Sequence, residues 1–446
     1  MGYHDEILRA NNNSEHRQFI KKFQAAKEDI VAFVNDLLGW QGAGQYHCWL
    51  KGSFNIGYVV KRPEGSGDDG RSRSVFIRFP IPGRTYSPWS AEKVKNEVMV
   101  LNYLREHTTI PLPYVHFWGP TENSPRQLAP FMLMDFMDGV CLDDLLKKPT
   151  ESDQDPLILD PEIDQEKLEL VYSQIADYMV QVSRLRFPSI GAISNDSGIW
   201  AVTGRPLTYD MNELVADTGF PAHMLPSGPL SCSSEFFRQR ADELWTHLCT
   251  QRNVCETKED ARQRFIARRR LAQSIPEYCV DDNLSFRLFS DDMGPFNMLA
   301  DPQTLQITAV LDFEFTNAMP AQHLHDVPSW LLLASPHCWL ERDDKTGFEK
   351  LFVPQMELFI HEVERAEAKI SSLRLSSRMR ESWRSGRFWF NYAMRTSIDA
   401  DVVYWKALDD GKGREMLDMK ELEQFAETKM EQFDAYLKEK ENDPRL

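Results

Sequence analysis

The spacing of hydrophobic and polar residues changes along the chain. Up to residue 136 it predicts one helix followed by strands. Residues 15–40 place apolar side chains such as Phe19 and Phe23 between charged residues at helical spacing. The runs HCWLKGSFNIGYVVKR and VFIRFP predict strands, separated by a polar loop at 63–74 that is rich in Gly, Ser and charge. The run PFMLMDF at 130–136 predicts a further, buried strand.

Helical patterns dominate the rest of the chain. A helix is predicted at 88–106, because Ser87 can cap it and a proline follows at the first helical position. The segment EKLELVYSQIADYMVQVSRL repeats apolar residues at steps of three and four, and an acidic amphipathic helix is predicted around 413–441. A strand pair at 296–313 interrupts the helices, whereas no pattern places the elements of 190–285.

These patterns predict an α+β protein with two unequal parts. A helical extension at 1–45 precedes a small sheet-bearing part with one helix at 46–138. The larger, mainly helical part spans 139–446 and contains the hairpin region 288–315. A chain of 446 residues, 42% of them hydrophobic, is long enough to form two such parts with a real core.

The net charge and the cysteines indicate which binding partners and which cellular compartment to expect. A net charge of −17 argues against a nucleic-acid-binding surface and is compatible with a pocket for a cationic substrate. Seven scattered cysteines without a C-x-x-C pair favour a reducing compartment over a disulfide framework or a zinc site. The N-terminus lacks an apolar signal core, and the longest apolar run, WLLLA at 330–334, is too short for a bilayer. We expect a soluble, cytoplasmic protein that binds neither nucleic acid nor membrane, and the sequence leaves its oligomeric state open.

Three further groups of residues receive structural interpretations. The segment ARQRFIARRRLAQ carries five arginines and predicts a solvated helix face. His323 and His325 have no matching pair of metal ligands, so we interpret them as loop residues. Four tryptophans are expected to fill the helical core rather than line a pocket, namely Trp330, Trp383, Trp389 and Trp405.

The segment LFSDDMGPFNMLAD at 288–301 combines carboxylates and an amide with turn-forming residues. Turn chemistry alone is one explanation. The second run of the hairpin ends at Asp312, so folding it back brings Asp312 beside Asn297. Two such oxygens suit Mg²⁺, which takes its other ligands from water and phosphate. Asp292 lies five residues before Asn297, where it can accept a proton from a hydroxyl that attacks a phosphate.

The order D-x-x-x-x-N, strand, turn, strand, D-F resembles the catalytic core of the protein-kinase-like fold. It is most similar to the aminoglycoside phosphotransferase and choline kinase branch, whose loop usually reads H-x-D-x-x-x-x-N. This resemblance implies a two-lobed fold with a small N-terminal antiparallel sheet lobe and a larger helical lobe. It also implies that Asp292 is the catalytic base and that Asn297 and Asp312 are the metal ligands.

Two residues of this chain stand where the family has residues that brace the catalytic loop. Ser290 stands where the family has the histidine that braces the loop, which leaves catalytic activity open. Asp326 stands where the family has a loop-bracing Asp, and it can equally be the N-cap of a helix after Pro328.

The N-terminal part offers candidates for a nucleotide site. Glu97 falls on the apolar face of its helix and needs a cation, which Arg78 on the preceding strand can supply, with Phe76 on the same strand face. In the family such a pair holds the α- and β-phosphates, and an ordinary salt bridge is the alternative. Gly52 and Gly57 are candidates for a phosphate-covering loop or for a plain hairpin turn.

The run FMLMDFMDG resembles the segment that joins the two lobes in this family. The resemblance implies that the backbone near Asp135 and Met137 meets the adenine of ATP, with Met134 behind it.

Together these features predict an ATP- and Mg²⁺-dependent phosphotransferase that acts on the hydroxyl group of a small molecule. Only thirteen residues separate Asp312 from Asp326, too few for the regulated activation loop of a protein kinase. The alternative is a catalytically impaired pseudokinase that binds a nucleotide or a partner. Glu314 either favours an amine-bearing acceptor or is a solvated residue leaving the strand. The identity of the acceptor is not predicted.

Overall fold

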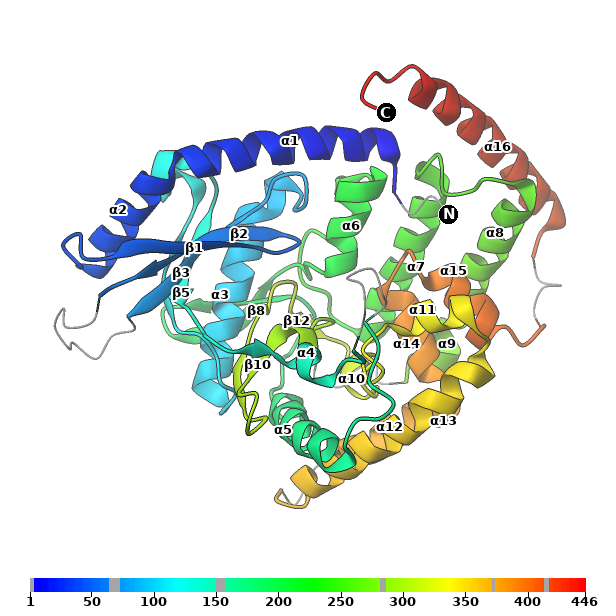
Figure 1. Ribbon diagram of the computed structural model, residues 1–446. Helices are drawn as coiled ribbons and strands as arrows, with labels where there is room; N and C mark the ends of the chain where they lie inside the picture. Colours follow the sequence, from blue (N-terminus) through cyan, green and yellow to red (C-terminus); the bar gives the residue numbers. More distant parts are fainter. Residues whose placement is uncertain (1–3, 64–72, 150–156, 281–285, 371–373, 413–416) are drawn as a thin grey trace.

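The computed structural model shows a small sheet-bearing lobe joined to a larger helical lobe (Figure 1). It describes residues 4–63, 73–149, 157–280, 286–370, 374–412 and 417–446. Most of the predicted polar loop at 63–74 and the start of the predicted helix at 413–441 lie outside the described residues.

The small lobe is built on a five-stranded antiparallel sheet in the order β1-β2-β3-β5-β4. Its strands are β1 (Gln45–Lys51), β2 (Asn55–Lys61), β3 (Ser74–Pro80), β4 (Val115–Gly119) and β5 (Phe131–Asp135). As the alternation in β3 predicts, Val75, Ile77 and Phe79 enter the core on one face of the sheet. Phe76 and Arg78 lie on the opposite face and line the pockets described below.

Helices cover both faces of this sheet. A short turn, η1 (Ser87–Trp89), leads into α3 (Ser90–His107), whose residues Val94 and Val98 belong to the large core that also contains Met132 and Met134 of β5. The other face is covered by α1 (Glu6–Ala25) and α2 (Lys27–Leu38). The single helix predicted at 15–40 is therefore two helices, because the chain turns at Ala26 and both segments then pack their apolar residues on the sheet.

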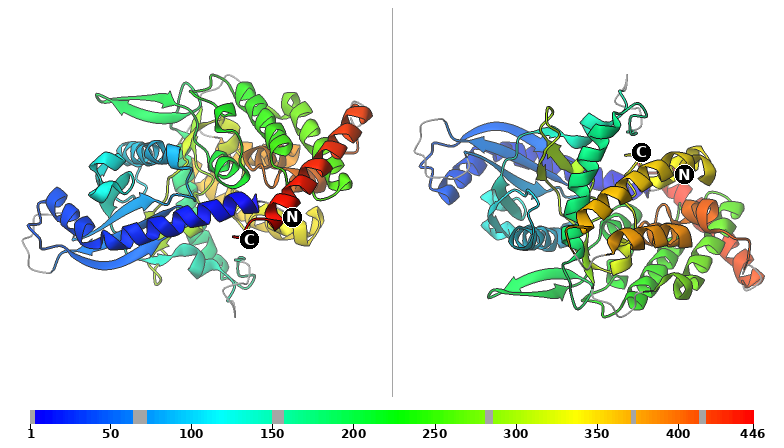
Figure 2. Two further views of the ribbon diagram at one scale, coloured as in Figure 1. Left: turned by 90° about the horizontal axis from the view of Figure 1, so that it is seen from above. Right: turned by 90° about the horizontal axis from the view of Figure 1, so that it is seen from below.

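The first helix also contacts the larger lobe. The side chain of Asn12 donates to the carbonyl of Ala216 at 2.6 Å, and the backbone N–H of Asp5 donates to Asp217 at 2.9 Å. Figure 2 shows α1 extending from the sheet towards the helical lobe, where both ends of the chain lie.

The larger lobe is mainly helical. Its helices are α4 (Leu142–Leu146), α5 (Gln165–Ser183), α6 (Tyr209–Thr218), α7 (Ser233–Thr250), α8 (Lys258–Gln273), α9 (Ile275–Tyr278), α10 (Ala321–Leu324), α11 (Pro336–Arg342), α12 (Lys345–Glu367), α13 (Leu375–Ser385), α14 (Arg387–Arg395), α15 (Ala400–Val403) and α16 (Met419–Glu441). Its short strands are β6 (Val140–Cys141), β7 (Ala192–Asp196), β8 (Ile199–Gly204), β9 (Arg287–Phe289), β10 (Met298–Ala300), β11 (Ile307–Val310) and β12 (Asn317–Met319). The predicted α+β architecture, a small antiparallel sheet lobe followed by a larger, mainly helical lobe, is confirmed.

Two structural interpretations have different outcomes. Trp330 and Trp389 are buried in the large core and Trp383 and Trp405 pack against it, so the core interpretation of the tryptophans is confirmed.

The arginine-rich helix α8 is only partly solvated. Arg264 and Arg268 are buried and both pair with Asp401, because α8 lies between α16 and the other helices of the lobe. Among the described residues, none of the helices is long and apolar enough to cross a membrane.

Candidate active site

The hairpin brings Asn297 and Asp312 to the same end of the ladder, as its pattern predicts. Strands β10 and β11 pair with Met298 opposite Val310, and the N–H of Leu311 donates to the carbonyl of Asn297 at 2.8 Å. Asn297 directly precedes β10, and Asp312 lies just beyond β11. Both side chains line a pocket of about 520 Å³ between the lobes, together with Asp292.

The loop before the hairpin is closed by hydrogen bonds to one carbonyl oxygen. The backbone oxygen of Asp292 accepts from the Asn297 side-chain amide at 3.0 Å and from the N–H of Gly294 at 2.9 Å. The hydroxyl of Ser290 accepts from the N–H of Asp292 at 3.3 Å. The five-residue spacing therefore fixes the loop through the backbone and leaves the Asp292 carboxyl group to face the pocket. Burial above all, and then the nearby carboxylates of Asp291 and Glu314, raises the pKa of that group to about 7.

Asp312 is held in an uncommon backbone conformation. Its φ of 60° lies in the left-handed region, which few non-glycine residues adopt and which is found at functional sites. Within the described residues, no hydrogen bond reaches its buried Oδ1 atom, and Arg78 Nη1 lies 3.6 Å from that oxygen. Burial and the nearby Glu314 raise the pKa of Asp312 to about 7, although Arg78 opposes them.

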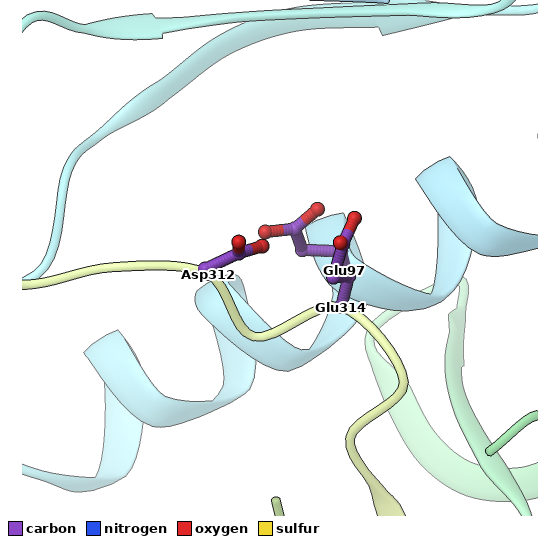
Figure 3. A group of neighbouring side chains, drawn as sticks. All are labelled: Glu97, Asp312 and Glu314. Atoms are coloured by element: carbon purple, nitrogen blue, oxygen red, sulfur yellow. The ribbon is translucent and has the colours of Figure 1, made fainter. Parts of the chain in front are cut away.

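Arg78 of β3 and Glu97 of α3 form the ion pair that the sequence predicts. Both side chains are less than a tenth exposed, so each charge depends on the other. The carboxyl groups of Glu97, Asp312 and Glu314 lie within 4.8 Å of one another (Figure 3). Glu97 enters this group from α3, and the other two enter it from the chain that follows β11 (Figure 3).

Glu314 is not a solvated residue leaving the strand. Its side chain is 2% exposed and forms an ion pair with Lys93 of α3. The side chain of Asn55, at the start of β2, donates to Glu314 Oε2 at 2.8 Å and accepts from Lys93 Nζ at 3.0 Å. Lys93 was not among the residues predicted for the site, although it lies four residues before Glu97 and therefore on the same face of the helix.

A second pocket, of about 370 Å³, adjoins the first and is lined by the segment predicted to join the lobes. Met134, Asp135 and Met137 line it. Its lining also includes Arg78, Asn297 and Asp312, which the two pockets share. The Asp135 carboxylate accepts from the N–H of Tyr114 at 3.2 Å and contacts His116 Nε2 at 2.8 Å, so this side chain binds β4.

The two candidate glycines differ in their surroundings. Gly52 lies in the turn between β1 and β2 and lines the first pocket. Gly57 lies inside β2 opposite Arg78, where a Cβ atom would collide with the carbonyl oxygen of Ile77 and the ring of Phe76. Close packing against β3 is therefore sufficient to explain Gly57.

Asp326 lies beneath the loop rather than at a helix start. It is buried and accepts hydrogen bonds from Ser382 of α13 and Asn391 of α14. The N-cap interpretation is wrong, because the next helix, α11, begins at Pro336. Asp326 and Ser290 line a narrow cavity of about 60 Å³ under the loop.

The loop interpretation is wrong for His323, whereas His325 lies in the turn that follows α10. His323 belongs to α10, is 1% exposed and lines the cavity under the loop. Its ring packs against three phenylalanines, Phe236, Phe237 and Phe289. Arg395 of α14 was also not predicted for the site, and its Nε lies 3.4 Å from the Asp291 carboxylate.

The oxygens at the mouth of the hairpin fit a hard divalent cation. Asp312 offers a buried carboxylate oxygen without a hydrogen-bond partner among the described residues, and Asn297 offers an amide at the same end of the ladder. Mg²⁺ is bound by one or two such protein oxygens, with the rest from water and phosphate.

No family model matches the chain. Altered inheritance of mitochondria protein 9 of Saccharomyces cerevisiae is 28% identical to it over 329 residues, 64% of this chain and 50% of the relative. The chain thus spans about half the length of that curated relative.

Solved structures of small-molecule kinases are similar to the chain at low identity. A choline kinase of Cryptosporidium parvum is 11% identical, with a TM-score of 0.43, over 93% of this chain and 95% of that one. An aminoglycoside phosphotransferase of Streptomyces rimosus is 13% identical, with a TM-score of 0.38, over 84% of this chain and 98% of that one.

Proposed function

We propose that the protein is an ATP- and Mg²⁺-dependent phosphotransferase whose acceptor is a hydroxyl group of a small molecule. One observation carries this proposal: Asp292, Asn297 and Asp312, from two stretches of chain, line one pocket beside the Arg78–Glu97 pair. Turn formation alone would explain the polar residues of the loop, but it does not require the buried Arg78 beside them.

Each side chain has a distinct role in the proposed reaction. Asn297 and Asp312 hold Mg²⁺, which supplies positive charge to the phosphates when it is bound. Arg78, oriented by Glu97, binds phosphate oxygens through its planar guanidinium group. Asp292 accepts the proton of the acceptor hydroxyl, and a pKa of about 7 suits a base that works near neutral pH.

The nucleotide base is proposed to occupy the second pocket. Met134, Asp135 and Met137 line it, and Leu101 and Leu299 provide apolar walls. This pocket adjoins the first at the residues that both share, and we propose that a triphosphate extends from one towards the other.

The acceptor is proposed to be an amine-bearing alcohol. The first pocket is lined by the carboxyl groups of Asp292, Asp312 and Glu314, and Tyr209 closes it from α6. Such a concentration of acidic groups attracts a cationic molecule.

Binding without turnover is the second candidate function. Ser290 favours it, because the residue that usually braces the loop is absent. The Lys93–Glu314 pair does not decide between the two, since it leaves Asp292 and Asp312 facing the pocket.

Thermal stabilisation by ATP, with and without Mg²⁺, is the first test. We expect a Mg²⁺-dependent rise in melting temperature that Asp312→Ala abolishes and that the exposed control Asp196→Asn preserves.

ATP consumption in a screen of hydroxyl-bearing amines is expected to stop in Asp292→Asn, which retains ATP binding. Stabilisation that ignores Mg²⁺ and survives Asp312→Ala contradicts the metal site. Binding without consumption for any acceptor supports the pseudokinase alternative.

The location of the protein is part of the proposal. All seven cysteines are free, which suits a reducing compartment such as the cytoplasm. Fractionation of cells that express a tagged protein tests this against the mitochondrial location in the relative's name.

A further inference from the structure

A cysteine, a histidine and an aspartate form a connected cluster away from the pockets described above. The Cys338 Sγ atom lies 3.2 Å from His337 Nε2. On the other side of the imidazole ring, His337 Nδ1 lies 2.9 Å from Asp399 Oδ2. His337 and Cys338 belong to α11, whereas Asp399 lies just before α15, so two distant segments of the chain build the cluster.

Further polar groups fix the aspartate and the thiol. The hydroxyl of Tyr392 on α14 donates to Asp399 Oδ2 at 3.2 Å. The hydroxyl of Ser335 lies 3.5 Å from Cys338 Sγ and 3.1 Å from His337 Nδ1. The arrangement has the three parts of an activated nucleophile: a thiol, a base within hydrogen-bond reach, and a carboxylate that orients the base.

The charges around the cluster stabilise a thiolate and an imidazolium. Burial opposes a charge on His337, but the hydrogen bonds that the imidazolium donates to Asp399 and Cys338, together with the charges of these two groups, outweigh burial and raise the pKa of His337 to about 10. The hydrogen bond from His337 lowers the pKa of Cys338, and burial and the Asp399 charge oppose that shift. The other ionisable group at the cluster is Tyr392, whose pKa is raised well above its ordinary value by burial and Asp399, so it stays neutral.

Cys141 and Cys255 lie in surroundings that disfavour a thiolate. Cys141 donates to the carbonyl of Phe296 at 3.3 Å, and burial raises its pKa to about 12. Burial raises the pKa of Cys255 to about 12 as well. Cys338 is half-buried rather than enclosed, so a small reagent can reach it.

We propose that Cys338 is a reactive thiol, activated by His337 and Asp399, and a site of oxidation by peroxides. In the proposed step the thiolate attacks one oxygen of hydrogen peroxide, an S–O bond forms and the O–O bond breaks. The leaving hydroxide takes the proton of the His337 imidazolium and departs as water. Sulfur is oxidised to the sulfenic acid, the peroxide is reduced, and the ion pair between residues 337 and 338 is lost.

Alkylation of the full chain by iodoacetamide, followed peptide by peptide by mass spectrometry, tests the activation. At pH 7 only about 3% of an ordinary thiol is ionised, so we expect Cys338 to react about tenfold faster than free cysteine. Cys141, whose pKa is raised by burial, is expected to react more slowly than either thiol. Because its pKa is lowered, the rate at Cys338 is expected to rise less steeply between pH 6 and 8 than that of an ordinary thiol, which gains about tenfold per pH unit over this range. A rate at Cys338 that rises tenfold per unit overturns the proposal without any variant.

Variants of the base and its carboxylate test the mechanism. His337→Gln is expected to lower the alkylation rate of Cys338 at pH 7 about tenfold, and Asp399→Asn to lower it less. The His337 side chain is 28% exposed, so its replacement leaves the core intact. An unchanged pH profile in His337→Gln contradicts the role of the imidazole.

Hydrogen peroxide followed by dimedone tests the oxidation itself. We expect the sulfenic acid adduct on Cys338 in the unaltered chain, a weaker adduct in His337→Gln, and no adduct in Cys141. Equal labelling of Cys338 and Cys141, or no labelling of Cys338, overturns the proposal. None of these measurements depends on phosphotransfer.

Discussion

Lys93 of α3 and Glu314 of the chain after β11 form an ion pair that is almost completely removed from solvent, with exposed fractions of 1% and 2%. Asn55 hydrogen-bonds to both partners, so the start of β2, the helix and the hairpin meet at one point. This point lies at the wall of the pocket that Asp312 lines. The pair therefore connects the sheet lobe to the segment that carries the candidate metal ligand.

Removal of one partner of this pair is expected to destabilise the protein strongly. Lys93→Met leaves the Glu314 carboxylate buried without its cation, and Glu314→Met leaves the ammonium group unpaired. Each change is expected to lower the free energy of unfolding by about 3–5 kcal/mol. The double variant is expected to lose much less than the sum, because two apolar side chains can replace a buried pair at little cost.

Urea unfolding of the four proteins measures these effects, with Lys95→Met as the matched control. Lys95 lies on the exposed face of the same helix, and its replacement is expected to change stability by less than about 0.5 kcal/mol. Additive losses in the double variant show that the two charges do not depend on each other.

Gly57 and Gly52 allow a prediction that separates packing from phosphate binding. In Gly57→Ala the new methyl group meets the carbonyl oxygen of Ile77, so β2 and β3 must separate. We expect a loss of about 1–3 kcal/mol in unfolding free energy, as for other overpacked sites. In Gly52→Ala the new methyl group has the Asn55 oxygen at 3.9 Å and otherwise open space, so stability is expected to change by less than about 1 kcal/mol.

ATP affinity completes this comparison. A phosphate-covering role for the turn predicts weaker binding in Gly52→Ala at unchanged stability. If Gly57→Ala is as stable as the unaltered chain, close packing of β2 against β3 does not explain the glycine at position 57.

Arg78 is expected to be irreplaceable by lysine in nucleotide binding. Its guanidinium group pairs with Glu97 and lies 3.6 Å from Asp312, a geometry that a single ammonium group cannot reproduce. One charged hydrogen bond contributes about 1.5–3 kcal/mol, so we expect Arg78→Lys to weaken ATP binding about tenfold or more. Calorimetric titration with ATP and Mg²⁺ measures this effect. The exposed Arg73 near the start of the same strand provides the control, since Arg73→Lys is expected to bind ATP normally. Equal affinity in Arg78→Lys makes the pair with Glu97 an ordinary salt bridge.

Local patterns were sufficient to predict the parts of the site that depend on neighbouring residues. The alternation of β3 placed Arg78 on the pocket face, and the helical period of α3 placed Glu97 where it could meet Arg78. The turn at Asp301 and Pro302 made the hairpin, and the hairpin brought Asp312 beside Asn297. Each of these inferences needs only the geometry of one or two elements.

Contacts between distant segments could not be predicted in this way. Asp401 lies far along the chain from Arg264 and Arg268, so the sequence of α8 alone predicts a solvated face. The residues around Glu314 do not show whether its side chain is exposed or buried. It is buried because it pairs with Lys93 of α3. The N-cap reading of Asp326 failed for the same reason, since Ser382 and Asn391 bind it from helices more than fifty residues further along.

Asp326 predicts a pH dependence of stability. Burial raises its pKa to about 7, although Arg395, Ser382, Asn391 and Arg387 favour the charged form. The folded protein therefore holds this proton more tightly than the unfolded chain, in which an aspartate has a pKa near 3.9. Its contribution to stability is fully present below the unfolded pKa and is lost as the pH rises through about 7. Between these values the slope is about 1.4 kcal/mol per pH unit from this one group.

Replacement by asparagine removes this titration while it keeps the shape of the side chain. Urea unfolding of the unaltered chain and of Asp326→Asn at pH 5, 6, 7 and 8 isolates the effect as the difference between the two proteins. We expect Asp326→Asn to gain stability relative to the unaltered chain by about 1–3 kcal/mol between pH 5 and 7, and little beyond pH 7. A difference that stays constant over the whole range means that Asp326 is charged in the folded protein throughout. In that case the neighbouring arginines, Arg395 above all, outweigh the burial of the carboxyl group.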